Sequence, residues 1–466
     1  MIPKHRTGGA AAAALSLLAS AAHAGEHQWP DLVEPGTETA PASPAERSDQ
    51  AATTAETASG AAAAPAAAER DLTIEAGDFS IRPRAQYRLR YRHHEGHDFT
   101  EGGISDTLRH RARLGVGISW PKWSDRLGVL VELQDVRTFG EETSTTRDYA
   151  ADGFDLHQGY GYLRMVRSFT MRFGRQEIFY ENGRLLGLSD WQEPARSYDA
   201  VRFSYDDAGL QVDSFYAKIR ETNVGLGIDA EPSGGRHLLA GNLHYDLMRE
   251  LGAGVLVTSD LTELDGRKQT TAGALVAGEA GESTTFSYAA DGYYQFGSAY
   301  GDTSFSSFLV GAEARLTLGV PGRPYLEGVG VLLSGDDDPD DLTARTFELP
   351  FGGNHVRYGE MDFFIDMPRD TDQRGLRDLG GALGAKPTEA VHLRAAYHLM
   401  QAMADRPDGL RTFGHELDVK GEYRFWTYAR AAVFYGVFFP QGLFERGVAG
   451  PGAEHFAYVT LDLKLE

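Results

Sequence analysis

FSIRPRAQYRLRYR, residues 79–92, decides the fold of this chain, because apolar and basic side chains alternate along it. Successive side chains of a β-strand point to opposite faces, so the stretch predicts a strand with one apolar face and one row of guanidinium groups. A soluble sheet would bury the apolar face, whereas a membrane barrel turns it to lipid and turns the charged face to a wet lumen. The basic face holds Arg82, Arg84, Arg88, Arg90 and Arg92, and the other face holds Phe79, Ile81, Ala85, Tyr87, Leu89 and Tyr91.

The pattern repeats in TLRHRARLGVGISW, residues 107–120, where Arg109, Arg111 and Arg113 share one face. Parity puts His110 on the apolar face, where we expect it near a membrane interface. Rows of like charge repel each other and are costly in a compact core. A water-filled passage for anions explains these rows better than the alternative interpretation, an exposed basic face of a soluble sheet.

The N-terminal segments predict export from the cytoplasm. Residues 1–24 combine a charged start, a short apolar stretch and the small-residue site Ala22-His23-Ala24, as in a secretory signal peptide. Residues 25–72 are rich in Ala, Pro and Glu and are expected to form a disordered periplasmic linker. The chain has no cysteine, which removes disulfide scaffolds and thiol chemistry, and no later stretch has the apolar length of a membrane helix.

The net charge of −22 lies largely away from the arginine rows. Residues 25–70 carry a balance of −6 and residues 335–372 a balance of −8, together −14 of the total. Segments 79–93 and 107–120 hold eight arginines and no acid. This distribution argues against nucleic acid as a partner.

From residue 79 onward, segments of roughly 10–14 residues alternate apolar and polar side chains. The connections between them are alternately short and long, as in outer-membrane barrels with short periplasmic turns and long extracellular loops. Placing the candidate strand 356–366 inside the long connection 335–372 preserves this rhythm and an even number of strands. We therefore predict an all-β fold over residues 73–466, a transmembrane antiparallel β-barrel of about 18 strands with long extracellular loops. Loop 335–372 is long enough to fold inward and narrow the lumen.

The final segment, AYVTLDLKLE at 457–466, predicts how the barrel closes. Its apolar face would meet lipid, and Asp462 and Lys464 lie on the opposite face. Pairing of this strand with the first arginine strand would remove the open edge of the sheet. Arg394 lies on the polar face of another alternating segment and joins the predicted lumen wall.

Residues 173–205, FGRQEIFYENGRLLGLSDWQEPARSYDAVRFSY, resemble the alginate export family of outer-membrane barrels. The resemblance is carried by Gly174-Arg175-Gln176-Glu177, by Gly183-Arg184-Leu185-Leu186-Gly187, by Asp190-Trp191 and by the run from Arg196 to Arg202. More diffuse similarity extends over nearly all of 79–466, including Leu133-Gln134-Asp135 and Ser334-Gly335-Asp336.

The resemblance implies a narrow, electropositive lumen in which arginines and a few carboxylates pass an anionic polysaccharide. It makes Arg175 the best candidate for the constriction. It also matches Asp199 and Arg202 on the following strand, and Arg430 and Asp462 where similar lining charges occur. Guanidinium binds carboxylate through bidentate hydrogen bonds and stays charged, while acids such as Glu177, Asp199 and Asp462 would keep the polymer from sticking.

Three functions follow as alternatives. The first is an outer-membrane channel for an alginate-like polyuronate or related anion, with export as the expected direction. The second is an anion-selective or general porin for small solutes, and the third is a plugged structural or adhesion barrel. Outer-membrane lipid and lipopolysaccharide would surround it, periplasmic secretion components are candidate partners, and a monomer is expected from the resemblance. The sequence shows no nucleophile motif of an enzyme and requires no cofactor. SGDDDPDD at 334–341 resembles a calcium loop only loosely, so Asp336, Asp338 and Asp340 are weak metal candidates beside the interpretation of a solvated acidic loop.

Overall fold

The computed structural model describes residues 72–95, 104–120, 126–140, 154–220, 235–248, 250–263, 266–355, 357–444 and 452–465. The predicted signal peptide, 1–24, and nearly all of the predicted linker, 25–72, lie outside these described residues.

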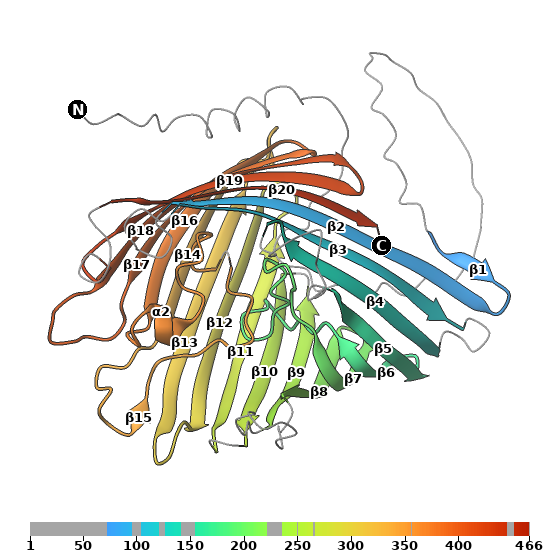
Figure 1. Cartoon of the computed structure of the whole chain (residues 1–466), viewed down its shortest axis with the longest axis horizontal. Helices are drawn as coiled ribbons and strands as arrows, with labels where there is room; N and C mark the ends of the chain where they lie inside the picture. Colours follow the sequence, from blue (N-terminus) through green and yellow to red (C-terminus); the bar gives the residue numbers. More distant parts are fainter. Residues whose placement is uncertain are drawn as a thin grey trace.

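Eighteen strands form the wall of one closed antiparallel barrel, as the sequence predicted (Figure 1). The first wall strand, β2 (Phe79–Glu95), pairs with both β3 (Ile104–Ser119) and the last strand, β20 (Glu454–Leu465), so the sheet has no open edge. The other wall strands are β4 (Leu127–Thr138), β5 (Phe154–Val166), β6 (Phe169–Gln176), β7 (Tyr198–Asp207), β8 (Leu210–Arg220), β9 (Arg236–Met248), β10 (Leu251–Thr262), β11 (Lys268–Ala280), β12 (Thr285–Ser298), β13 (Ser304–Thr317), β14 (Tyr325–Leu333), β16 (Leu376–Thr388), β17 (Val391–Gln401), β18 (Thr412–Trp426) and β19 (Ala429–Pro440).

Three short elements lie outside the wall ladder. β1 (Ile74–Ala76) forms a hairpin with the start of β2, and β15 (Thr343–Ala344) runs parallel to the start of β13. The single-turn helix α2 (Met367–Asp370) belongs to the connection between β14 and β16. Residues 357–366 form no strand, in agreement with their predicted place inside a long loop.

Side chains alternate between the two faces of the wall. On β3, Arg111 is fully buried, whereas the side chain of Leu114 is 69% exposed on the outer surface. The same alternation places a band of apolar side chains around the outside, including Val255 and Val257 on β10 and Phe308 and Val310 on β13. In an outer membrane this band faces the acyl chains. Among the described residues, no helix has the length and apolarity needed to span a membrane.

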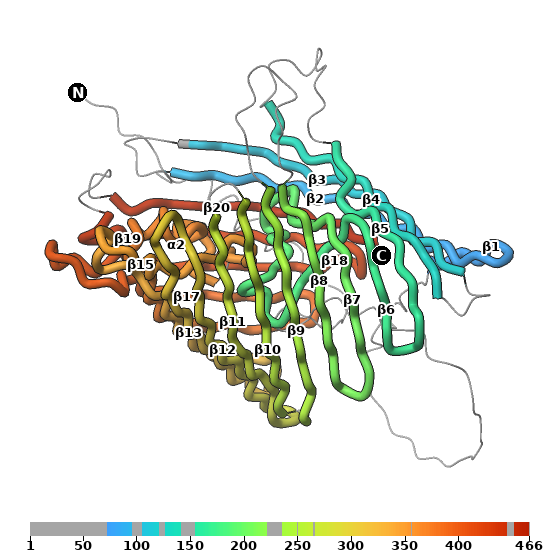
Figure 2. The backbone as a smooth tube through the Cα atoms, turned by 90° about the horizontal axis from the view of Figure 1, so that it is seen from below, coloured from blue at the N-terminus to red at the C-terminus, as the bar shows by residue number. Residues whose placement is uncertain are grey.

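Two long connections fold into the barrel from the end opposite the short turns (Figures 1 and 2). The first inward loop, residues 177–197, joins β6 to β7, and the second inward loop, residues 334–375, joins β14 to β16. The sequence predicted the inward course of the second loop but not that of the first. Apolar side chains of both loops, among them Ile178, Leu186, Phe347 and Phe364, pack with inward residues such as Phe438 into a hydrophobic core inside the barrel. The loops are therefore packed parts of the fold.

If the outer face of the wall meets lipid, the loss of stability caused by a charge on it should depend on the depth of that charge in the bilayer. Val310 and Leu316 lie on the same face of β13, at mid-strand and near its periplasmic end. We expect Val310→Arg to lower the free energy of unfolding in lipid vesicles by roughly 2–4 kcal/mol, and Leu316→Arg by about 0–1 kcal/mol, because the guanidinium reaches water only from the shallow site. Urea titration in vesicles measures both values. Equal costs at the two depths would contradict the assignment of this face to lipid.

Candidate permeation site

A cavity of about 3220 Å³ occupies the interior of the barrel below and beside the inward loops. Its lining includes Ser168, in a short turn at the periplasmic end, and Arg236 and Arg267, near the outer end. Residues at both ends of the wall thus contact one continuous space.

One side of this cavity is basic. Arg82 and Arg84 on β2, together with side chains of β5, β6 and β20, form what we call the basic strip. Its members are Arg82, Arg84, Arg164, Arg167, Arg172 and Lys464. Tyr160 and Tyr162 lie among them on β5. No carboxylate occurs among the described cavity-lining residues of β20 and β2–β6. The strip therefore presents an attractive surface to an anion.

The opposite side, from β7 to β14, carries half of the described carboxylates that line the cavity. Its cations are held in ion pairs: Arg202 lies 2.7 Å from Asp213, and Arg315 lies 2.7 Å from Glu327. The acids of this wall are Asp206, Asp207, Asp213, Asp246, Glu279, Glu313 and Glu327. The lumen is therefore polarised across its width, and an anion is favoured on the basic strip.

The inward loops meet at a junction beside the cavity, where an arginine of each loop donates hydrogen bonds to the backbone of the other. Arg196 of the first loop donates to the carbonyl oxygens of Phe351 and Gly352, and Arg357 of the second loop donates to the carbonyl oxygen of Asn182. Both guanidinium groups line the cavity, and within the described part of the chain neither has a carboxylate within ion-pair distance. Their positive charge is thus not cancelled by a direct partner.

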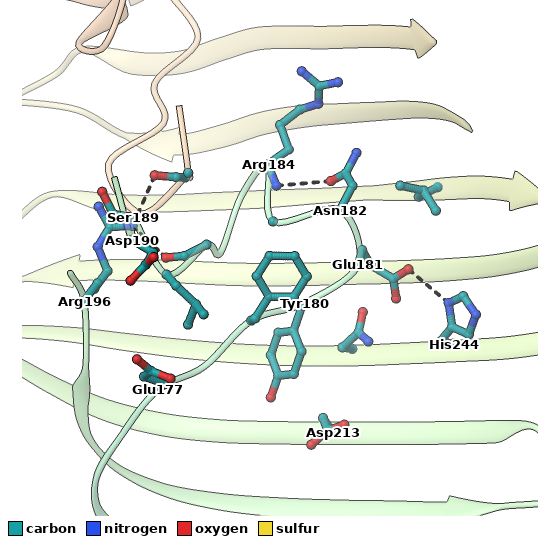
Figure 3. A pocket seen from close by; sticks show the side chains of 18 of the residues that line it. Glu177, Tyr180, Glu181, Asn182, Arg184, Ser189, Asp190, Arg196, Asp213 and His244 are labelled. Atoms are coloured by element: carbon teal, nitrogen blue, oxygen red, sulfur yellow. Dashed lines mark hydrogen bonds and ion pairs between the residues drawn. The ribbon is translucent and has the colours of Figure 1, made fainter. Parts of the chain in front are cut away.

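Glycine allows this close approach of the two loops. A Cβ atom on Gly187 would lie 2.6 Å from the backbone nitrogen of Gly353. The backbone nitrogen of Gly187 donates to Phe351, and that of Gly353 donates to Gly183, at 2.9 and 3.0 Å. Arg184 extends from the same segment (Figure 3) and binds Asp291 on the wall, with Nε at 2.5 Å from Oδ2. The junction is therefore fixed to the barrel as well as to itself.

The first inward loop covers much of the arginine ladder that dominates the sequence. Arg88 donates to Asp190 of this loop at 2.9 Å and to Asp462 of β20 at 2.6 Å, and Arg90 lies 3.1 Å from Glu193. Burial alone would raise the pKa of Asp190, but the charges of Arg88 and Arg111 outweigh it and hold the pKa well below its ordinary value. Hence these ladder arginines point inward but lie beneath a loop that neutralises them, and they are absent from the cavity lining.

Trp191 joins the ladder to the second inward loop. The guanidinium of Arg90 lies 3.8 Å from the centre of the indole ring, and the imidazole of His355 stacks on the ring at 3.7 Å. The indole nitrogen donates to Asp362 at 2.6 Å. Burial would raise the pKa of Asp362, but the neighbouring His355 and these hydrogen bonds lower it. This cluster connects β2 and both loops through one side chain.

Arg175 does not lie at the constriction, contrary to the expectation from the sequence. On β6 it has the parity of Phe173, whose side chain is exposed on the outer surface, whereas Arg172 and Gln176 line the cavity. Asp199, its partner at 2.8 Å, lies on the same outer face of β7. The motif resemblance singled out both residues as lining candidates but carried no information about strand parity.

Some of the other predicted lining residues contact the cavity and some do not. Arg82, Arg84, Glu177, Arg202, Arg394 and Lys464 line the cavity, whereas Arg109, Arg111, Arg113, Arg430 and Asp462 are not among its lining residues. Arg113 donates to Gln134 at 2.7 Å and lies 3.5 Å from Glu177. Arg394 lies 3.0 Å from Glu327 and 3.3 Å from Glu360, and Arg430 lies 3.2 Å from Asp462. Glu360 lies in the second inward loop, outside the membrane strands. Burial alone would raise its pKa, but nearby cations, led by Lys420, lower it below its ordinary value.

The acidic segment 334–341 uses its carboxylates within the loop. Asp336 accepts hydrogen bonds from the backbone nitrogens of Asp338 and Arg345, and Asp341 pairs with Arg345 at 2.7 Å. Among the described residues, no group of three or more His, Asp or Glu side chains is placed to hold a metal ion. The weak metal candidates Asp336, Asp338 and Asp340 thus receive no support.

The sequence matches the alginate export family over residues 81–449. The chain belongs to the alginate export family. This assignment and the barrel fold make it an outer-membrane channel protein. The comparison with curated proteins gave no match.

Solved outer-membrane barrels share the fold of this alginate export family member at low sequence identity. OccAB4 of Acinetobacter baumannii is 9% identical with a TM-score of 0.59, and the match covers 85% of this chain and 99% of that one. OccAB1 of the same organism is 11% identical with a TM-score of 0.56, covering 83% and 96%. A BenF-like porin from Pseudomonas fluorescens Pf-5 is 8% identical with a TM-score of 0.57, covering 83% and 98%.

Several cavity-lining arginines were not predicted from the sequence. Arg164 and Arg172 share a face with Tyr160 and Tyr162 across β5 and β6, so strand parity alone could have found them. Arg184, Arg196 and Arg357 lie in loops, where no periodicity indicates direction. Their positions depend on the packing of the two loops against each other.

The buried pair Arg90–Glu193 predicts a large effect from a small change. Both side chains are almost completely buried, so Glu193→Gln leaves a guanidinium without its counter-charge. We expect the free energy of unfolding to fall by about 3–5 kcal/mol. The matched control is Asp155→Asn in the exposed pair with Arg175, for which about 0–1 kcal/mol is expected. Urea titration of both variants gives the comparison, and a negligible effect of E193Q would show that the loop is not held by this pair.

Proposed function

We propose that this channel passes an anionic polysaccharide, of the polyuronate class, along the basic strip and past the loop junction, in the export direction. The observation that carries the proposal is the basic strip itself, with cations from β20, β2, β5 and β6 and no lining carboxylate on those strands. An extended polyuronate carries one carboxylate per sugar. A row of separate cations suits such a polymer, because each contact is weak enough to be released as the next one forms.

The chemistry of the strip supports a sugar acid over a simple ion. Guanidinium groups give bidentate, charge-assisted hydrogen bonds to carboxylates. Tyr160 and Tyr162 add aromatic and hydroxyl surface next to Arg164 on β5, which suits the mixed apolar and polar faces of a sugar ring. The acids on the opposite wall would repel the polymer and keep it on the strip.

A second candidate, an anion-selective porin for small solutes, is favoured by the loops. Their hydrophobic core fills part of the outer half of the barrel, and the junction arginines are fixed by carbonyl groups of the opposite loop. A small anion would pass such a junction with less rearrangement than a polymer. The two functions differ in whether a polyuronate blocks the current.

Charge reversal on the two faces of one strand tests the proposal. Arg172 lines the cavity and Arg175 lies on the outer surface of the same strand. In planar bilayers under a salt gradient, we expect Arg172→Glu to lower the anion-to-cation permeability ratio several-fold, because it places a carboxylate on the strip. Arg175→Glu, the matched control, should keep the wild-type ratio.

Block by polyuronate added to the periplasmic side decides between the two candidates. Wild-type current that falls on addition of the polymer, with weaker block in R172E, supports the polysaccharide channel. Anion-selective current that is indifferent to the polymer supports the porin. Equal permeability of cations and anions in the wild type would contradict both.

A further inference from the structure

We propose that each inward loop is held to the wall by a latch that needs a proton, so that the passage is narrow in acid and widens as the pH rises. The two latches lie on different strands of the wall, β9 and β18, and consist of different residue types. The first is a carboxylate–imidazole–carboxylate contact on the first inward loop, and the second is a pair of buried carboxylates that holds the second inward loop.

In the first latch, His244 of β9 lies between two carboxylates. Its Nδ1 is 3.0 Å from Oε2 of Glu181 in the first inward loop (Figure 3). Its Nε2 is 3.2 Å from Oδ1 of Asp246. Only the imidazolium form has an N–H on both ring nitrogens, so only this form donates to both acids at once. Loss of the proton leaves one nitrogen as an acceptor facing a carboxylate oxygen.

The backbone of Glu181 shows that this contact is imposed on the loop. Its φ of 53° lies in the left-handed region, which is unfavourable for a residue with a side chain. Its buried carboxylate occupies the place that a Cβ on Gly254 would need, since that atom would lie 2.4 Å from the carboxylate oxygens. Without the bond to His244, the strained segment has less to hold it in this position.

Among the described residues, no other charged side chain competes directly for His244. From β8, Gln211 lies opposite it in the strand register, and Asp213, one inward position away, is engaged by Arg202. From β10, Gly252 and Gly254 contribute no side chain at this point. Glu181 and Asp246 are therefore the charges that decide whether the ring keeps its proton, and both favour the imidazolium.

In the second latch, Glu416 and Asp418 lie two residues apart on the inner face of β18 and contact each other. Both are almost completely buried. Glu416 accepts from the backbone nitrogen of Met361 at 3.0 Å, and Asp418 accepts from that of Glu360 at 3.5 Å. These bonds hold the segment of the second inward loop that crosses β18.

Each acid of the second latch also has one buried oxygen that meets no donor among the described residues, Oε2 of Glu416 and Oδ1 of Asp418. A proton on one carboxyl group would supply the missing donor. Two adjacent carboxylates in a dry site share one proton, because full ionisation places two like charges side by side.

The charges around the second latch are already committed to other partners. On β17 and β16, His398 is bound to Asp378 at 2.9 Å. Lys420, the next inward residue of β18, lies 3.0 Å from Glu360 of the loop, and Arg394 lies 3.3 Å from the same carboxylate. The facing positions on β19 are Phe438 and Gly436, which carry no charge. The acid pair therefore depends on its own proton.

Both latches respond to pH in the same direction. The first contact is complete while His244 is protonated and is weakened as the pH rises through the titration of that ring. The second is stable while the pair keeps its proton and is repulsive after the proton leaves. For each proton released on opening, the open-to-closed ratio can rise up to tenfold per pH unit across the titration.

This inference rests on the proposed channel function, and single-channel recording between pH 5 and pH 9, taken at intervals in planar bilayers, tests it. We expect the open fraction of the wild type to rise with pH. The double variant Glu416→Gln/Asp418→Asn carries permanent N–H donors in place of the proton and should open less than the wild type at high pH, because only the first latch still releases. His244→Asn should raise the open fraction at low pH, because it cannot form the imidazolium bridge.

His455→Asn is the matched control, because His455 lies on the outer face of β20 and binds Tyr435 at 2.8 Å. It should keep the wild-type pH profile. A flat wild-type profile, or a wild-type profile that persists in both E416Q/D418N and H244N, would overturn the latch proposal. Heat-modifiable migration in detergent gels verifies that each variant has folded before it is recorded.

A distance measurement separates failure of the latch from failure of the channel. Because the chain has no native cysteine, Ser189→Cys in the first inward loop and Leu243→Cys on the outer face of β9 can be spin-labelled as a pair. We expect one narrow distance distribution at pH 5 and a second, shifted population at pH 9. A pH-dependent shift without any ion current would reject the channel and keep the first latch, whereas current with an unchanged distribution would reject the first latch.

Discussion

The structure depends on neutralising guanidinium groups that strand alternation places inside the barrel. The outward parity of β2 and β3 is fixed by lipid, so their arginines must face the interior. A buried guanidinium without a counter-charge is costly, and the first inward loop supplies Asp190 and Glu193 to Arg88 and Arg90. The loop, its contact with the second loop through Trp191, and the packed core inside the barrel all follow from this requirement.

The same requirement divides the arginines into two groups. Arg88 and Arg90, in the outer half of β2, are covered by the first inward loop and hold it in place. Arg82 and Arg84, nearer the periplasmic end of the same strand, line the cavity. The ladder that looks uniform in the sequence therefore docks a loop in one part and lines the cavity in the other. The junction arginines Arg196 and Arg357 add charge where the loops meet, bound only to carbonyl groups among their described partners.

The sequence predicted the barrel, its strand number and its closure through β2 and β20 because period-two alternation is a local signal that lipid makes unambiguous. It also predicted the inward course of 335–372 from length and strand count. It could not predict that 177–197 folds inward as well, since that depends on contacts with strands distant in the chain, such as Arg184 with Asp291. Arg175 was misplaced because a motif match gives a position in the family but not the face of the strand, which a count from Phe173 would have given.

The proposed function requires that anions travel on one side of the lumen, over β20 and β2–β6. Anomalous diffraction from crystals of the protein soaked in bromide tests it most directly. We expect peaks beside Arg82, Arg84, Arg164 and Arg172 and none along the carboxylates of β7–β14. Peaks confined to the outer surface, or spread evenly around the inner wall, would contradict it.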